Sequence, residues 1–338
     1  MIIEAIKKIV DSQNLSETEM AEVTDEIMGG RATASQIGAF ITALRMKGET
    51  IEELTAAAKV MRKKVAPLNL SIQNDSVLLD TCGTGGDMKG TFNISTVSAF
   101  VIAGAGVKVA KHGNRSVSSK CGSADLIQAL GINIDVSTKK VAECIEEVGF
   151  GFLYAPIFHG AMKFAAIPRK EIGIRTIFNM IGPLTNPAMA EAQLLGVYDH
   201  KLTETFAIVL MNLGCKHALI VHGSDGLDEI TITGNTKITE LIGKEIKTYN
   251  IHPEDFGLES GGITDLQGGD IKENVRIARE LLNGRKGTKR DVVLLNSAAG
   301  LIAAGKAKDM FQGIKISAES INSGKAMDIL QKLVKFTN

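Results

Sequence analysis

From Val77 onward the chain alternates short runs of β-branched and leucine residues with segments of helical pattern. Such short apolar runs are typical of strands buried on both faces, and helices between them favour parallel strand order. The pattern therefore predicts an α/β fold with a mostly parallel central sheet surrounded by helices. The predicted strands are VLLD (77–80), VKVA (107–110), FLYA (152–155), QLLGVY (193–198) and ALIVHG (218–223). Three later runs lack helices between them and predict an antiparallel addition at one edge: EITIT (229–233), TKITEL (236–241) and EIKTYN (245–250).

The first 65 residues predict a separate, all-helical unit. Capping-box pairs at Ser16 with Glu19, Thr33 with Gln36 and Thr50 with Glu53 mark helix starts. We expect helices over about 2–12, 17–28, 34–47 and 51–65, and later over 271–283, 287–305 and 324–336. The helix-rich stretch at about 157–189 is suited to pack on the first four. The expected organisation is a small helical lobe, 1–66 joined by 157–189, and a larger lobe, 75–156 with 190–338, with a ligand cleft between them.

Bulk composition limits the class of ligand. The chain has 38 Lys plus Arg and 38 Asp plus Glu, so overall charge gives no reason to expect nucleic acid or an anionic membrane as partner. The longest apolar run, at 97–107, is too short to span a bilayer. Four scattered cysteines show no metal-ligand spacing, which favours reduced thiols in a cytoplasm. Any anion binding must therefore be local.

Three glycines, Gly83, Gly85 and Gly86, follow the first predicted strand and precede a helical pattern at 95–105. Bare backbone N–H groups near a helix N-terminus favour anion binding, although a tight turn without a ligand would also use glycine. Neither the P-loop nor the dinucleotide-binding pattern is present. The helix start carries more short polar side chains than a cap needs, which favours phosphate: Thr91, Asn93, Ser95 and Thr96.

A basic segment, KHGNRSVSSKCGSAD at 111–125, follows the next predicted strand. It combines four cationic or imidazole side chains with many short hydrogen-bond donors and almost nothing apolar. A solvated surface loop is the ordinary alternative. Ligands of parallel sheets lie beyond the carboxyl ends of the strands, so this loop and the glycine loop would face one site. Two anion-binding loops favour a ligand with phosphates at both ends.

Asp228 and Glu229 follow the predicted strand at 218–223. In an extended chain they point in different directions, which suits two metal positions better than one. Carboxylates beside a phosphate site would repel the ligand without a divalent cation, so the pair predicts Mg²⁺, with an acidic turn as the alternative. Arg169 is a candidate for bidentate binding of a substrate carboxylate. Arg175 is interpreted as a surface charge.

Together, several segments resemble the anthranilate phosphoribosyltransferases, which are phosphoribosyltransferases of the nucleoside-phosphorylase type: GTGGD (83–87), NIST (93–96), KHGNRSVSSKCGSAD (111–125), NPA (186–188) and DE (228–229). The resemblance runs from end to end. It implies a Mg²⁺-dependent transfer of the 5-phosphoribosyl group from 5-phosphoribosyl 1-diphosphate to the amine of anthranilate, in tryptophan biosynthesis. It also implies a homodimer formed through the helical lobe, in the cytoplasm that the cysteine pattern favours.

The resemblance assigns site residues to three groups. Anthranilate would contact Gly83, His112, Asn114 and Arg169, and metal, with two Mg²⁺ ions in the site, would be held by Ser95, Asp228 and Glu229. Lys111 with Mg²⁺ would stabilise the leaving diphosphate, and no nucleophile or obligate base is expected. The phosphoribosyl donor would contact Gly83, Gly86, Asp87, Thr91, Asn93, Ile94, Ser95, Thr96, Lys111, His112, Gly113, Asn114, Arg115, Ser116, Val117, Ser118, Ser119 and Ser123.

Two alternatives remain. A pyrimidine nucleoside phosphorylase would share the glycine loop and lobes, but it should carry a different basic motif and has no need for the acidic pair. A catalytically silent relative that binds nucleic acid disagrees with the balanced charge and the intact carboxylates.

Overall fold

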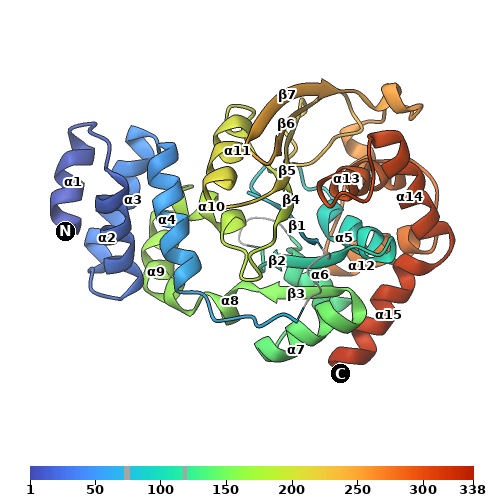
Figure 1. Ribbon diagram of the computed structural model, residues 1–338, viewed down its shortest axis with the longest axis horizontal. Coiled ribbons are helices and arrows are strands. Elements are labelled where there is room, and N and C mark those ends of the chain that lie inside the picture. The colour runs from blue at the N-terminus through green and yellow to red at the C-terminus, as the bar shows by residue number, and fades with distance from the viewer. Residues whose placement is uncertain (72–76, 117–119) are drawn as a thin grey trace.

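The computed structural model describes residues 1–71, 77–116 and 120–338. Within them, one sheet has the strand order β3-β2-β1-β4-β5-β6-β7 (Figure 1). The first five strands pair in parallel, whereas β6 and β7 are antiparallel additions. The predicted α/β class with a mostly parallel sheet is confirmed. The strands are β1 (Leu78–Gly83), β2 (Lys108–Gly113), β3 (Phe150–Tyr154), β4 (Ala192–Gly196), β5 (His217–Gly223), β6 (Thr236–Ile242) and β7 (Glu245–Ile251).

The prediction of a strand at 229–233 was wrong. Side chains, rather than a neighbouring strand, satisfy the backbone of this segment. Asn296 Oδ1 accepts the Ile230 N–H at 2.9 Å, and Thr236 Oγ1 accepts the Thr231 N–H at 3.0 Å. Ile230 and Ile232 are fully buried. Their alternation with threonine therefore reflects a buried loop whose polar groups find partners locally.

The N-terminal helices are α1 (Ile2–Val10), α2 (Glu17–Met28), α3 (Ala34–Lys47) and α4 (Ile51–Lys63). All three predicted capping boxes are formed, while α1 and α4 end two residues earlier than predicted. The chain returns to this lobe after β3, where α8 (Ala155–Phe158) leads into α9 (Lys163–Ile172) and α10 (Ile177–Ile181). The α9 helix packs on α2 and α3, and α10 packs on α3 and α4 (Figure 1).

The larger lobe carries the remaining helices: α5 (Ile94–Gly104), α6 (Ser123–Ala129), α7 (Thr138–Glu143), α11 (Leu202–Asn212), α12 (Ile271–Leu282), α13 (Thr288–Ala303), α14 (Met310–Asn322) and α15 (Lys325–Thr337). The α14 helix was not predicted. Small side chains such as Gly313, Ser317 and Ser320 form much of its buried face, so it lacks the apolar stripe that marks a helix in sequence.

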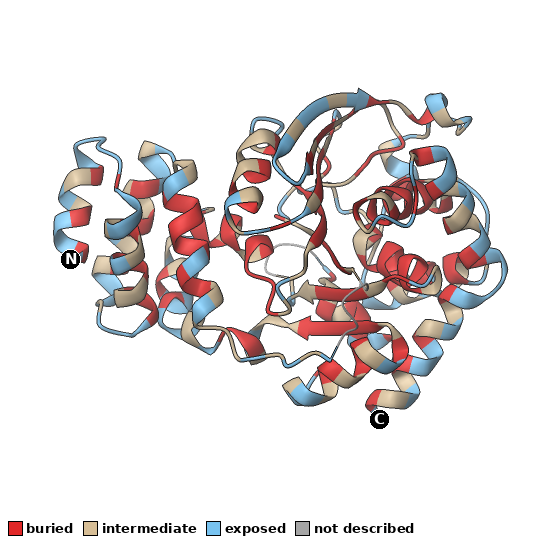
Figure 2. Cartoon of the chain, in the orientation of Figure 1, coloured by how far each residue is buried: buried red, intermediate tan, exposed pale blue. Residues whose placement is uncertain are grey.

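Two large apolar cores lie on opposite faces of the sheet (Figure 2). Successive residues of a strand point to opposite faces of the sheet. Leu194 and Leu219 therefore belong to one core, and Leu195 and Ile220 to the other. The first core joins the sheet to α5 and α13. The second runs through α11 into the helical lobe without a break. No helix in the described part of the chain is long and apolar enough to cross a membrane.

Candidate active site

The glycine loop leaves β1 at its carboxyl end and is held by the protein itself. The Thr84 N–H donates to the Gly196 carbonyl at 2.9 Å, and the Gly85 N–H donates to Asp228 Oδ2 at 2.7 Å. From the other side, Arg175 donates to the carbonyls of Gly85, at 2.7 Å, and Thr84, at 3.2 Å. The loop is thus fixed between an aspartate and an arginine that lie far from it in sequence.

Close neighbours explain three glycines at this edge. A Cβ on Gly83 would lie 2.4 Å from Asp228 Oδ2, and one on Gly196 would lie 1.6 Å from the Asp228 carbonyl oxygen. A Cβ on Gly86 would lie 1.7 Å from Arg175 Nη1. The absence of side chains at these glycines therefore leaves room for Asp228 and Arg175 of the protein itself. The interpretation of Arg175 as a surface charge was wrong.

The two predicted metal ligands of the acidic pair contact different segments of the same edge. Asp228 accepts from the glycine loop, whereas Glu229 Oε1 accepts the Ser95 N–H at 3.1 Å, where α5 begins. Burial raises the pKa of Asp228 to about 6, and the neighbouring Asp87 adds to that shift. Burial, followed by the charge of Asp228, raises the pKa of Glu229 to about 8. Crowded carboxylates of this kind favour a nearby cation.

The donor set fits Mg²⁺. Asp228, Glu229 and the Ser95 hydroxyl supply hard oxygen ligands, the type that Mg²⁺ prefers. No cluster of three or more His, Cys, Asp and Glu side chains with metal-binding geometry occurs among residues 1–71, 77–116 and 120–338. A sparse protein ligand set is the usual arrangement for Mg²⁺ that is shared with substrate phosphates and water.

Lys111 lies beneath the site instead of on its surface. Its side chain is only 1% exposed, and Nζ donates to the Thr81 carbonyl and to Ser95 Oγ, the latter at 3.3 Å. Burial lowers the pKa of the ammonium, while Asp80 and Glu229 oppose that shift. The predicted role of Lys111 with Mg²⁺ in stabilising the leaving diphosphate stays a prediction. In the structure the ammonium contacts Ser95 and lies near Glu229.

In the basic loop, Arg115 forms hydrogen bonds within the protein itself. The guanidinium donates to Asp125 at 2.8 Å, Gln128 at 2.7 Å and the Tyr154 hydroxyl at 3.1 Å. Arg115 therefore ties the loop to α6 and β3, and its predicted contact with the donor stays a prediction. Asn114 and Ser123 are joined by a 3.3 Å hydrogen bond, and the Ser116 N–H donates to Asp125 at 3.3 Å. The predicted contacts Val117, Ser118 and Ser119 lie outside the described residues.

The predicted donor contacts at and before the start of α5 differ in how far they are buried. The side chains of Ile94 and Thr96 are buried, so only their backbone can face a ligand. Asn93 Nδ2 donates to the Cys121 carbonyl at 3.1 Å and thereby links the two loops. Thr91 forms a β-bridge with Gln267. Asp87 Oδ1 accepts the Lys89 N–H at 3.3 Å, and its carboxylate lies beside Asp228.

His112 and Arg169 differ in how they are partnered. The His112 N–H donates to Asp80 Oδ1 at 3.1 Å, and its ring lies 5.0 Å from that of His159, which burial also keeps neutral. Burial lowers the pKa of His112 to about 3, and Gly113 follows it at the end of β2. The Arg169 guanidinium lies 5.4 Å from the centre of the Phe178 ring, and burial lowers its pKa. No carboxylate of the described chain forms an ion pair with it.

Known proteins share this arrangement along the whole chain. Residues 3–65 match the helical bundle domain of a glycosyl transferase family, and residues 75–327 match its α/β domain. The anthranilate phosphoribosyltransferase of Geotalea uraniireducens is 54% identical over 349 residues, with 100% of both chains covered. That of Moorella thermoacetica is 57% identical over 334 residues, covering 99% of this chain and 98% of the relative. The chain belongs to the anthranilate phosphoribosyltransferase family.

Solved structures of the anthranilate phosphoribosyltransferase family have the same fold. The enzyme from Thermus thermophilus has a TM-score of 0.93 and 42% identity, covering 98% of this chain and 99% of that chain. The enzyme from Saccharomyces cerevisiae in complex with PRPP and Mg has a TM-score of 0.91 and 30% identity, covering 99% and 97%.

Sequence reasoning missed the residues that fix the glycine loop in this member of the anthranilate phosphoribosyltransferase family: Thr84, Arg175, Gly196 and Tyr198. The Tyr198 N–H donates to Thr84 Oγ1 at 3.1 Å. Gly196 carried the one usable signal, because a glycine that ends a buried central strand often marks a close backbone approach. Nothing local to Arg175 indicates its partners, which lie 90 and 91 residues away.

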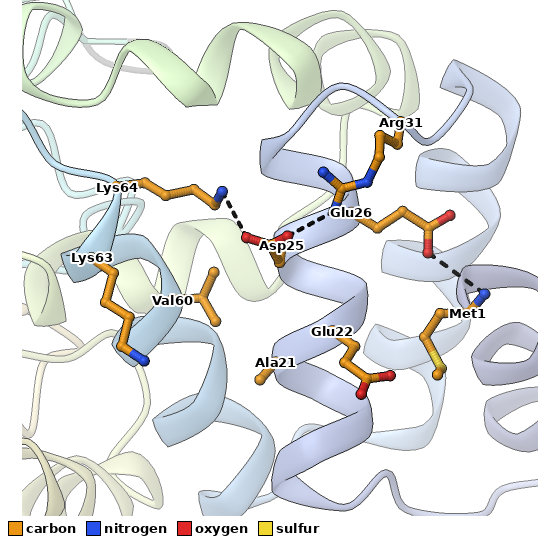
Figure 3. Close-up of a pocket in the computed structure, with 9 residues that line it drawn as sticks. All are labelled: Met1, Ala21, Glu22, Asp25, Glu26, Arg31, Val60, Lys63 and Lys64. Carbon is orange, nitrogen blue, oxygen red and sulfur yellow. Dashed lines mark hydrogen bonds and ion pairs between the residues drawn. The ribbon is translucent and has the colours of Figure 1, made fainter.

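A hollow of about 620 Å³ lies elsewhere, on the helical lobe between α2, α4 and the N-terminus (Figure 3). None of its lining residues is a predicted site residue of this anthranilate phosphoribosyltransferase family member. Asp25 in its wall is paired with both Arg31 and Lys64, and the Met1 ammonium is paired with Glu26. Much of the charge around this hollow is thus already neutralised, so we place the chemistry at the glycine loop.

Proposed function

We propose that the protein transfers the 5-phosphoribosyl group from 5-phosphoribosyl 1-diphosphate to the amine of anthranilate and releases diphosphate, forming N-(5-phosphoribosyl)anthranilate for tryptophan biosynthesis. The observation that carries this proposal is the convergence of the glycine loop, Ser95 and both acidic side chains at one edge of the sheet. Curated relatives with this activity in their names, 52–57% identical over nearly the full chain, support it.

The transfer places positive charge on the ribose and negative charge on the departing oxygens, so the site should chiefly stabilise the leaving group and align the amine. Backbone N–H groups of the glycine loop and the start of α5 are suited to hold donor phosphates. Ser95, Asp228 and Glu229 would hold Mg²⁺, which we propose to be two ions. When bound, Mg²⁺ supplies positive charge opposite the diphosphate. The yeast structure with PRPP and Mg supports this dependence.

The acceptor needs alignment more than activation, because an aromatic amine is neutral at pH 7. Arg169, whose guanidinium has no carboxylate partner among the described residues, would bind the carboxylate of anthranilate. His112 stays uncharged because its pKa is low, so it can lie by the acceptor without attracting the donor's phosphates. Gly83 and Asn114 would complete this subsite.

The direct test is a fluorescence assay of anthranilate consumption with the phosphoribosyl donor and Mg²⁺, run beside phosphorolysis of thymidine and uridine. We expect Mg²⁺-dependent loss of anthranilate fluorescence and no phosphorolysis. Phosphorolysis without use of anthranilate would assign the protein to the nucleoside phosphorylases.

Arg169→Ala should raise the KM for anthranilate about 10- to 100-fold, since a charge-assisted hydrogen bond contributes about 1.5–3 kcal/mol. The KM for the donor should change little. Steady-state kinetics with each substrate varied in turn measures both values, and Lys170→Ala, one residue along the same helix, is the matched control. Equal effects on both substrates would count against the acceptor assignment.

Lys111→Met should reduce kcat/KM for the donor about 10- to 100-fold, because it removes the ammonium that supports Ser95 from below. Anthranilate use should suffer less. Lys108→Met, at the other end of β2, is the control. A defect confined to anthranilate would contradict the placement of Lys111 under the donor site.

We also propose a cytoplasmic homodimer formed through the helical lobe, consisting of residues 1–66 with the inserted helices 157–189. Exposed apolar side chains lie on neighbouring helices of this lobe, among them Val10 on α1, Met46 on α3 and Ile167 on α9. A self-associating face would cover such side chains. Sedimentation equilibrium tests the dimer.

A further inference from the structure

Arg175 reaches from the helical lobe to the back of the glycine loop. It lies in the connection between α9 and α10, two helices packed against α2, α3 and α4. Its guanidinium donates to the Gly85 carbonyl at 2.7 Å and to the Thr84 carbonyl at 3.2 Å. The same group stacks on the Tyr198 ring, 3.9 Å from the ring centre. Two directed hydrogen bonds and a stacking contact therefore fix the guanidinium in one place.

Holding these carbonyls also orients N–H groups, because a trans peptide points its C=O and N–H in opposite directions. The Thr84 carbonyl and the Gly85 N–H belong to one peptide. With the carbonyl on Arg175, the N–H faces away and donates to Asp228 Oδ2 at 2.7 Å. The Gly85 carbonyl and the Gly86 N–H belong to the next peptide, so the Gly86 N–H is also turned away from Arg175.

The backbone of the loop suits this role. Gly85 and Gly86 have φ values of +64° and +75°, in the left-handed region that glycine adopts without steric cost. Gly86 lies so close to Arg175 that an added Cβ would be 1.7 Å from Nη1. The guanidinium thus covers one side of the loop, and the Gly86 N–H points away from that side.

We propose that Arg175 is a positioning residue for the transfer reaction: it fixes the two glycine-loop peptides so that the Gly85 N–H holds Asp228 and the Gly86 N–H faces the diphosphate of the donor. The proposal rests on the proposed function for the identity of that ligand. It also makes the helical lobe, which carries Arg175, a determinant of donor affinity in the other lobe. Arginine is required because its fork reaches two carbonyls at once, whereas lysine offers a single point charge.

The first test compares Arg175→Ala and Arg175→Lys with the wild-type protein. Calorimetric titration with 5-phosphoribosyl 1-diphosphate and Mg²⁺ should show the donor Kd raised about 10- to 100-fold in the alanine variant, with only partial recovery in the lysine variant. The KM for anthranilate should stay nearly unchanged. Lys170→Ala, which removes an exposed cation from the end of α9, should behave as wild type. Equal losses for both substrates would overturn the proposal.

The second test needs no substrate. Hydrogen exchange of the peptide covering 84–87 should be faster in Arg175→Ala than in the wild-type protein, and unchanged in Lys170→Ala. Unchanged exchange in Arg175→Ala would overturn the proposal. If the wild-type protein did not use the donor, the proposed function would be wrong. Hydrogen exchange would still show whether Arg175 orders the loop.

A double-mutant cycle isolates the contact with Gly86. Gly86→Ala introduces backbone strain in both backgrounds, but its Cβ collides with the guanidinium only when Arg175 is present. We therefore expect Gly86→Ala to raise the donor Kd by a larger factor in the wild-type background than in Arg175→Ala. Equal factors would show that the two residues are not coupled.

Discussion

Replacing Asp228 by Asn together with Glu229 by Gln should lower kcat about 10³-fold, because the site loses both charged ligands that we assign to Mg²⁺. Raising the Mg²⁺ concentration should restore little of this rate. Initial rates measured across a Mg²⁺ titration give the result. Glu245→Gln with Glu259→Gln removes the same charge from exposed positions and should leave the rate intact. Unchanged metal dependence in the site variant would reject the assignment.

Thermal unfolding without metal shows whether the Asp228→Asn, Glu229→Gln variant is inactive because it lacks the metal ligands or because it is unstable. The pKa of Glu229, about 8, lies above its ordinary value, so the folded state binds this proton more tightly than the unfolded state does. Ionisation therefore destabilises the wild-type fold as pH rises from about 4.5 through 8. The amide variant should thus have a higher Tm than wild type at pH 8.5 and lose this advantage near pH 4.5. A lower Tm at pH 8.5 would mean that the carboxylates stabilise the fold.

Gly196→Ala should lower kcat about 10²-fold, the usual scale for a displacement of about 1 Å at a reacting centre. The new Cβ would lie 1.6 Å from the carbonyl oxygen of Asp228, a backbone atom that no rotamer change can move aside. Since Gly196 pairs with Gly83 and Val221 inside the sheet, the Asp228 segment has to move instead.

The Mg²⁺ requirement of Gly196→Ala should rise with the loss of rate, because Asp228 moves with its backbone. Gly160→Ala, where an added Cβ meets nothing within 4 Å, is the matched control. A wild-type rate with wild-type metal dependence would show that the acidic segment tolerates the displacement.

Local signals explain what the sequence predicted well. The hydrogen bonds of a capping box such as Thr33 with Gln36 lie within four residues. A short stretch of sequence is therefore enough to predict the start of α3. The strands that end at Gly83 and Gly113 were recognised because buried parallel strands leave continuous apolar runs. The strand predicted at 229–233 failed because Asn296, 66 residues from Ile230, supplies its hydrogen bonds.

Motifs located the candidate site, but not the direction of its side chains. The segments that carry Ser95, Asp228 and Glu229 do meet. A cationic side chain in a motif can still face a ligand, a neighbouring helix or the interior, and the sequence does not distinguish these cases. Arg115 donates to Asp125, which lies in the same motif, whereas Lys111 donates to the Thr81 carbonyl on the neighbouring strand.

The continuous core between α4, α11 and β4–β6 has a consequence for how the molecule can rearrange. Leu54 on α4 and Phe206 on α11 are both completely enclosed in it. Excising residues 1–65 would expose this surface to water, so the remaining chain would be an aggregation-prone fragment and not an independent domain. Any movement of one lobe relative to the other must therefore keep this shared core out of water.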